Sequence, residues 1–315
     1  TSNLPQMKKS MKHLFAALFL FYSMVIQAQV QITAEQDQER NLTLFAFNKD
    51  VIPYTVQIQF AKLDNLESLE GELLYKVAKP GKSTLVKLQS IYSNVQVGFR
   101  YNTKLYKGDF KPSLPFDAPY LIPVEKGKMV SMKPLIANQK QPEERRYTGV
   151  SFLGDQPFTV CAPRKGIISE IKMDVEKVAD GLADFSSENY VEIYHQDGSF
   201  TRLSGLKANS AKVVVGDTVI PGQALADSSP QANSSQHHVK MIQSRWEMEV
   251  NGVTWVNFPV LIRSEKEELL SDKASENLQS THPEELIAKE LDKKELKKPS
   301  TKLSSLIWSV LVFFG

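Results

Sequence analysis

Residues 189–198 of this 315-residue chain read NYVEIYHQDG, and residues 215–223 read VGDTVIPGQ. In the first stretch, β-branched and aromatic residues run into Asp197 and Gly198. This pair predicts a strand that ends in a tight hairpin, where Gly198 takes a positive φ. In the second stretch, Pro221 and Gly222 favour a type II turn. Both turns indicate short strands joined by tight connections.

Further short strands are expected on both sides of these turns. Gly, Asp-Gly and Pro-Gly signals separate them at regular intervals, which is typical of an all-β fold. The expected strands are 158–162, 166–173, 190–195, 200–206, 212–215, 223–226 and 238–242. They predict one β-domain over residues 147–263, and the polar residues 138–146 before it are expected to form an exposed loop.

Residues 29–135 predict a separate β-sandwich-like domain. Runs such as Thr55–Phe60 and Val95–Tyr101 alternate in the way that half-buried antiparallel strands do. Residues 125–130 are expected to be the strand that leads into the second domain. We interpret the first domain as a packing module that supports the second, with a binding surface as the alternative.

The two ends of the chain predict contact with the cell envelope. Residues 1–28 combine lysines, an apolar run from Leu14 to Ile26 and the small residue Ala28, which is the pattern of a secretory signal peptide. An uncleaved membrane anchor is the alternative. Residues 303–315 are apolar but would rise only roughly 20 Å as a helix. They are expected to anchor in a membrane interface, to pack on a partner or to begin a longer span.

Composition bears on the C-terminal tail, on nucleic-acid binding and on the role of the single cysteine. Residues 264–302 are rich in Glu and Lys with sparse apolar positions, which predicts a charged helix pair or a partly disordered tail. The net charge of +2 gives no argument for nucleic-acid binding. The single cysteine, Cys161, lies in an expected strand, so we interpret it as a buried core residue.

Four stretches together resemble a known family. VCAPRKGII at 160–168, the two stretches quoted first, and SSQHHVKM at 234–241 occur in an order and spacing similar to those of the lysostaphin/LytM-type peptidoglycan endopeptidases. The resemblance implies the duplicated hybrid motif fold for residues 147–263. The β-domain upstream also looks like that of secreted members from Bacteroidetes-type bacteria.

The resemblance places a zinc site on five positions of this sequence. The family's first two ligands, a His and an Asp four residues apart, fall on Tyr147 and Ser151. An assisting His falls on Gly205, and a late His-x-His pair falls on Gln236 and His238. A catalytic zinc site needs three protein ligands and an open position, and only His238 keeps its family residue. His195 matches a family hairpin His that is not a ligand, and we expect it to be a turn or surface residue.

The sequence therefore predicts a pseudoenzyme with no catalytic residue, no cofactor and no bound zinc. The five positions are expected to surround one shallow cleft, in which Ser151 and Gln236 would hold a peptide strand. His238 is expected to titrate near the ordinary value of about 6.5. The alternative is a divergent zinc metalloendopeptidase that recruits His237, His238, Asp155 or Asp227.

The expected partners follow from the family resemblance and from the ends of the chain. Inactive members imply binding to peptidoglycan, to a cell-wall hydrolase or to a division protein, with localisation in the periplasm or cell envelope. A third possibility is a membrane-docked scaffold that acts through residues 264–315. The sequence leaves the partner, the oligomeric state and the completeness of the C-terminus open.

Overall fold

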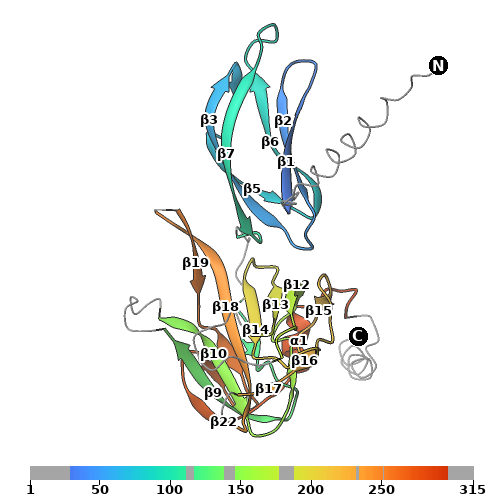
Figure 1. The fold of residues 1–315 in the computed structure, drawn as a ribbon, viewed down its shortest axis with the longest axis vertical. Helices are drawn as coiled ribbons and strands as arrows, with labels where there is room; N and C mark the ends of the chain where they lie inside the picture. Colours follow the sequence, from blue (N-terminus) through green and yellow to red (C-terminus); the bar gives the residue numbers. More distant parts are fainter. Residues whose placement is uncertain are drawn as a thin grey trace, which may run out of the picture.

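The computed structural model describes residues 29–110, 117–137, 146–176, 188–231, 234–250 and 252–296. Almost all of its regular structure is β, which confirms the all-β prediction. Figure 1 shows a smaller β body formed by the N-terminal strands and a larger one formed by the rest. The expected signal peptide and the apolar segment 303–315 fall outside the described residues.

The smaller body is a sandwich of two antiparallel sheets. The first sheet has the order β1-β2-β6-β4 and the second has the order β5-β3-β7. Buried residues of both sheets, including Leu44 and Ile58, form one hydrophobic cluster, as alternation in half-buried strands requires. The strands are β1 (Val30–Gln36), β2 (Leu42–Asn48), β3 (Tyr54–Asp64), β4 (Leu66–Glu67), β5 (Leu73–Ala78), β6 (Gly81–Ser90) and β7 (Gly98–Lys107).

The larger body is built on a ten-stranded sheet. Its order is β15-β12-β13-β14-β18-β10-β9-β22, and β17 and β19 also pair with β18. The strands are β9 (Met129–Ile136), β10 (Tyr147–Gly154), β12 (Gly166–Lys172), β13 (Tyr190–Tyr194), β14 (Phe200–Ser204), β15 (Thr218–Val219), β17 (Ser229–Pro230), β18 (His237–Glu249), β19 (Gly252–Asn257) and β22 (Ser275–Gln279).

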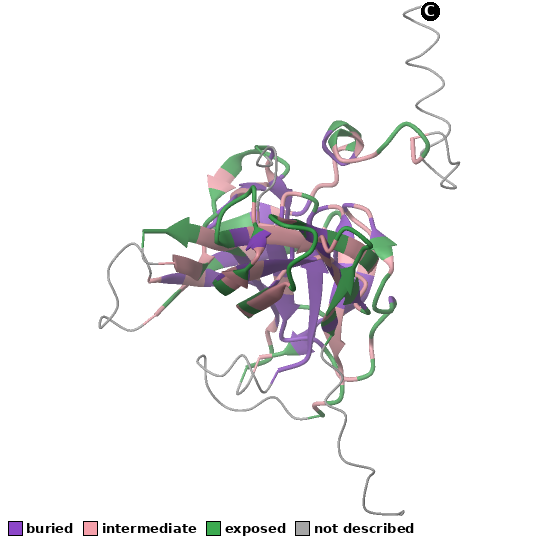
Figure 2. Cartoon of the chain, turned by 90° about the horizontal axis from the view of Figure 1, so that it is seen from above, coloured by how far each residue is buried: buried purple, intermediate pink, exposed green. Residues whose placement is uncertain are grey.

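Smaller elements complete this body. One sheet pairs β11 (Thr159–Cys161) with β16 (Ala224–Asp227), and another joins β8 (Tyr120–Leu121), β20 (Leu261–Arg263) and β21 (Glu268–Leu270). The short helix α1 (Glu284–Lys289) follows. One face of the large sheet packs against these elements, and Phe152, Ile193 and Met241 are fully buried there. Seen from above, buried residues concentrate in the central strands (Figure 2).

The division between the two bodies differs from the expected boundary at 136–146. β9 pairs with β10 and β22, and β8 pairs with β20, so residues 120–136 belong to the larger body. Val130 and Met132 alternate into the same core as Phe152. The lead-in strand expected at 125–130 is wrong for residues 125–128, which form a turn, and β9 begins at Met129.

The expected helical or disordered tail at 264–302 is wrong for its first part, where residues 268–270 and 275–279 form strands, whereas helix α1 lies further along it. β21 pairs with β20, and β22 pairs with β9, where Leu278 lies opposite Val130 and is 4% exposed. Pairing with β9 supplies backbone hydrogen-bond partners to β22 and buries Leu278, whereas Leu270 of β21 stays 45% exposed. The sequence did not predict β22, because this segment has no periodic apolar pattern. Pairing with the edge of β9, which lies far away in the sequence, decides that it is a strand.

Several local predictions are confirmed. Gly198 has φ +83 at the hairpin turn between β13 and β14. Pro221 and Gly222 form the turn closed by the hydrogen bond from Gln223 N to Ile220 O, and Gly222 has φ +83 as a type II turn requires. Cys161 is buried, and burial raises the pKa of its thiol to about 12. The strand expected at 212–215 is wrong, and the edge strand there is β15.

In the part of the chain that the structure describes, no helix has the length and apolar character needed to cross a membrane.

Candidate functional site

The expected site residues fall mainly on one face of the ten-stranded sheet. Along β18, Val239 and Met241 point into the core, so alternation turns His238 and Lys240 to the opposite face. Lys240 lies between Ser151 of β10 and Ser204 of β14 in the strand register. We call this opposite side the polar face.

Three of the five expected positions come together around His238. Gly205 follows β14 with φ +78, and a Cβ built on it would lie 2.5 Å from His238 Nε2. Ser151 is opposite Lys240, which is one alternation step from His238. All three residues are buried. The predicted shallow cleft is therefore wrong at these positions, because they form a closed cluster.

His238 is a buried imidazole beside a cation. Burial lowers its pKa, and the Lys240 ammonium lowers it further, against the opposing effects of Glu188 and of a hydrogen bond with the Ser229 backbone. Its Nδ1 has no hydrogen-bond partner among the described residues. The expected ordinary pKa is thus wrong, because the residue is only 2% exposed and its neighbour is charged.

Lys240 and Glu188 form an ion pair that sequence reasoning missed. Their side chains are only 5% and 3% exposed. Glu188 Oε2 and Ser204 Oγ are buried without a partner in the described parts of the chain. We call Glu188, Ser204, His238 and Lys240 the His238 cluster. A lysine flanked by Val239 and Met241 within an expected strand was the available signal, because a buried lysine requires a partner.

Tyr147 lies apart from the other expected positions. The register places His238 opposite Leu153, at the other end of β10 from Tyr147. A bulge between Tyr147 and Gly149 interrupts the alternation, and the Tyr147 hydroxyl bonds to Ser271 Oγ at 2.7 Å. Burial raises its pKa. Tyr147 therefore acts in packing between β10 and the segment after β21, and the five-residue cleft is not assembled.

The alternative metal ligands have other partners. Gln236 donates to Asp155 Oδ1 at 3.0 Å on the surface, and Lys212 pairs with Asp227 at 2.6 Å. His237 Nδ1 and Ser228 Oγ are 3.0 Å apart. Among the residues that the structure describes, no group of three or more His, Cys, Asp or Glu side chains is placed to hold a metal ion.

His195 is a core residue, so its expected place in a turn or on the surface is wrong. It is fully buried, with Nδ1 2.7 Å from Lys165 O and Nε2 2.7 Å from Thr201 Oγ1. The carbonyl requires a hydrogen on Nδ1, so Nε2 accepts from the threonine hydroxyl. Burial, and then the Arg164 guanidinium, lower the pKa of His195 to about 3.

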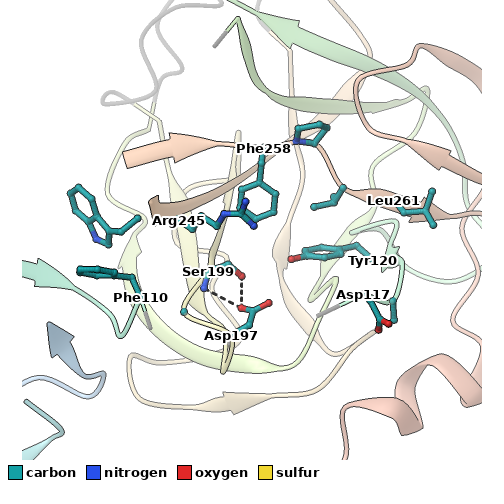
Figure 3. Close-up of a pocket in the computed structure, with 13 residues that line it drawn as sticks. Phe110, Asp117, Tyr120, Asp197, Ser199, Arg245, Phe258 and Leu261 are labelled. Carbon is teal, nitrogen blue, oxygen red and sulfur yellow. Dashed lines mark hydrogen bonds between the residues drawn. The ribbon is translucent and has the colours of Figure 1, made fainter. Parts of the chain in front are cut away.

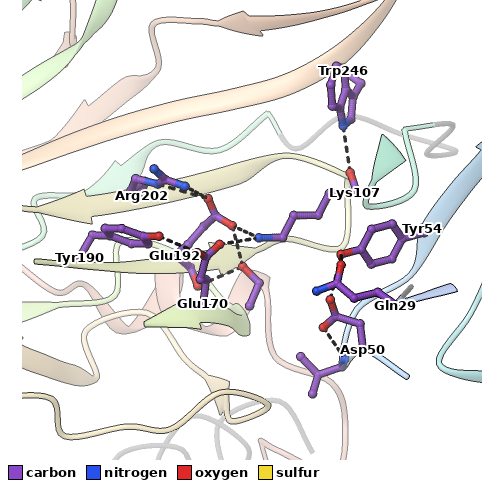
Figure 4. A network of polar contacts seen from close by, with 11 residues as sticks. Gln29, Asp50, Tyr54, Lys107, Glu170, Tyr190, Glu192, Arg202 and Trp246 are labelled. Carbon is purple, nitrogen blue, oxygen red and sulfur yellow. Dashed lines mark hydrogen bonds and ion pairs between the residues drawn. The ribbon is translucent and has the colours of Figure 1, made fainter. Parts of the chain in front are cut away.

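A second ion cluster on the polar face joins the two bodies (Figure 4). Lys107, at the end of β7, binds Glu170 at 3.0 Å and Glu192 at 2.5 Å. Arg202 binds the other oxygen of Glu192 at 2.8 Å, and Tyr190 donates to Glu170 at 2.5 Å. We call these five residues the joint cluster. Tyr194 and Phe200 beside it pack into the core of the sandwich.

Comparisons with known proteins return structural neighbours only. No family model and no curated protein matches the sequence. A chain of the SpoIIQ–SpoIIIAH pore-forming complex is 20% identical, with a TM-score of 0.30, and the match covers 44% of this chain and 87% of that one.

Two further neighbours are peptidases. A putative M23 peptidase from Pseudomonas aeruginosa is 12% identical with a TM-score of 0.28, covering 70% of this chain and 85% of its own. A zinc-containing peptidase from Vibrio cholerae is 11% identical with a TM-score of 0.32, covering 87% and 98%. Similarity at these scores carries no argument about the activity or partners of this chain.

Proposed function

We propose that this chain is a non-catalytic, peptidase-like protein of the cell envelope that binds a partner and does not cleave peptide bonds. The Lys240–Glu188 pair carries the proposal. A buried ammonium stands beside Ser151 and His238, at the place where the family resemblance puts zinc ligands. A divalent cation there would be repelled by this positive charge. It would also have only one imidazole as a ligand, whereas a catalytic zinc site supplies three protein ligands.

The lack of space for a side chain at Gly205 supports the same proposal. The family's assisting His would stand at this position, yet a Cβ there would lie 2.5 Å from His238 Nε2, and the backbone has a positive φ. Side chains rarely adopt that conformation, so a histidine would have to displace His238 or change the turn. The present backbone is built for glycine, which transfers no proton.

The divergent-enzyme alternative has less support. Asp155 and Asp227 each have a partner of their own, and His237 points to the opposite side of β18 from His238. The proposed export and envelope location rest on the sequence pattern of residues 1–28. The proposed partner classes are peptidoglycan, a cell-wall hydrolase or a division protein, and they rest on the family resemblance.

The experiment uses the full chain, because residues 264–279 contribute strands to the larger body. Purified protein is incubated with zinc, desalted and assayed for bound metal and for cleavage of purified muropeptides. We expect zinc far below one per chain and no cleavage. Cleavage that disappears in His238→Ala but persists in the matched control His237→Ala would refute the proposal. Sedimentation with purified peptidoglycan then separates the partner classes.

A further inference from the structure

A pocket of 410 Å³ lies at the end of the larger body that faces away from the His238 cluster. Five segments line it: Phe110 after β7, residues 117–120 at the start of β8, the β13–β14 turn, the far part of β18 and residues 258–261 from the end of β19 to the start of β20 (Figure 3). Its volume falls within the range of small-ligand sites. Arg245 of its wall is seven residues along β18 from His238, so the two places are roughly 20 Å apart.

Aromatic rings from four separate segments line this pocket. They are Phe110, Tyr120, Trp246 and Phe258. Trp246 is held in place because its Nε1 donates to Lys107 O at 3.0 Å and its ring packs edge-on against Tyr106 at 5.1 Å. Faces of aromatic rings attract cations. Two of the rings already lie beside guanidinium groups, Tyr120 at 5.0 Å from Arg164 and Phe258 at 4.6 Å from Arg245, so this wall is of a kind that suits an apolar stem with a positive end.

Asp197 supplies a permanent negative charge to the pocket. Its Oδ2 accepts from Arg164 at 2.8 Å, and its Oδ1 accepts from Ser199. Burial acts to raise its pKa, but Arg164 and Ser199 outweigh burial and hold the pKa at about 2. Arg164 is shared with Glu290 at 2.9 Å, so the three groups together keep one net negative charge.

The other two charged residues of the lining are Asp117 and Arg245. Asp117 is exposed and has no ion-pair partner in the described residues. Arg245 is paired with Glu247 at 2.6 Å, and its guanidinium lies 4.6 Å from the centre of the Phe258 ring. The lining itself therefore holds two carboxylates and one guanidinium, which gives it one net negative charge. The Arg245–Phe258 contact shows that its wall accepts a guanidinium face.

We propose that this pocket binds a basic side chain, lysine or arginine, of a partner polypeptide. The net charge and the aromatic wall both favour an aliphatic stem with a cationic end. A polypeptide is favoured over a free amine because β19, which pairs only with β18 in the described chain, leads directly into the Phe258–Leu261 wall. Its unpaired edge offers backbone hydrogen bonds to an extended segment that would carry the basic residue.

This inference concerns a surface separate from the His238 cluster, so it stands or fails independently of whether the chain cleaves peptides. The probes are acetylated and amidated pentapeptides that differ at the central residue: lysine, arginine, Nε-acetyllysine or glutamate. Butylamine is the small-amine arm. Binding to the full chain is measured by calorimetry and by the shift of the Trp246 indole N–H resonance, which Trp246→Phe assigns.

We expect the lysine and arginine peptides to bind and the acetyllysine and glutamate peptides to bind at least 10-fold more weakly. Asp117→Asn should weaken the lysine peptide about 3- to 10-fold, because it removes one nearby charge. The matched control Glu67→Gln removes an exposed carboxylate on the sandwich and should change nothing.

Several outcomes would overturn the inference. Equal binding of the acetyllysine peptide would exclude recognition of charge, and preferential binding of the glutamate peptide would assign the site to Arg245. Unchanged affinity in Asp117→Asn, with a native circular dichroism spectrum, would place the peptide elsewhere. Butylamine binding as tightly as the lysine peptide would assign the pocket to small amines and exclude the polypeptide partner.

Discussion

The joint cluster and the His238 cluster share one face of the same sheet, yet they differ in how completely their polar atoms are paired. In the joint cluster, both oxygens of Glu192 and both oxygens of Glu170 accept hydrogen bonds. In the His238 cluster, Glu188 Oε2, Ser204 Oγ and His238 Nδ1 have no partner among the described residues. Each such atom costs about 1–3 kcal/mol when buried.

This difference indicates that burial of charge is compensated more completely in the joint cluster than in the His238 cluster. A complete network that bridges two bodies is what a structural joint requires, since every charge removed from water is compensated. The His238 cluster is incomplete by comparison: Lys240 and Glu188 neutralise each other, but three buried polar atoms have no partner among the described residues.

Removing Lys240 should have the largest effect. Lys240→Met leaves Glu188 buried without its cation and should lower the free energy of unfolding by about 3–5 kcal/mol. The double variant Lys240→Met, Glu188→Leu removes both charges and should recover most of that loss. Urea unfolding of the three proteins measures both values. A double variant as unstable as the single one would show that the pair contributes more than mutual compensation.

Acid should destabilise the protein through its buried histidines. The folded-state pKa values of His195 and His238 lie below the unfolded value of about 6.5, so both rings are neutral in both states above that pH. As the pH falls from about 6.5 towards about 3, the unfolded chain gains protons that folded His195 cannot, and stability is lost.

His195→Gln isolates this contribution from that of the carboxylates. Between pH 7.5 and 4.5 the wild type should lose roughly 2–3 kcal/mol more than the variant. Urea unfolding at the two pH values gives the difference, and equal losses would contradict the assignment. For His238, NMR should show a ring that stays neutral below pH 6.5 whether or not a chelator is present.

The joint cluster should tolerate the loss of its lysine better. Lys107→Met leaves Glu192 with Arg202 and Glu170 with Tyr190, and the Lys107 side chain is already 28% exposed. We expect a loss of about 1–2 kcal/mol, measured by thermal unfolding. Lys62→Met, which removes an exposed pair with Asp64, should cost less than about 0.5 kcal/mol. A larger loss for Lys62 than for Lys107 would reverse the comparison.

The rim of the His238 cluster should matter least. Gln236→Ala removes one exposed hydrogen bond to Asp155 and should change the free energy of unfolding by less than about 0.5 kcal/mol. Chemical denaturation suffices to measure it. A loss above 1 kcal/mol would mean that Gln236 supports the buried cluster directly.

Local features of the fold were accessible from the sequence because they depend on neighbouring residues. The hairpin at Gly198 and the Pro221–Gly222 turn follow from backbone conformations that few residues adopt. The buried state of Cys161 follows from its place in a short apolar run. The position of β22 beside β9 was not accessible, since Leu278 is one apolar residue in a charged segment and its partner lies about 150 residues earlier.

In the candidate site, too, contacts between distant segments could not be predicted from the sequence. By itself, the sequence determined that four of the five positions matched to the resembled family carry Tyr, Ser, Gly and Gln instead of its His and Asp residues, because residue identity is read directly from the chain. Only the tertiary structure decided that Tyr147 turns to Ser271, that Gly205 touches His238, and that Glu188 meets Lys240. These contacts depend on a bulge, on strand register and on the pairing of distant segments, which long-range packing sets and local sequence does not encode.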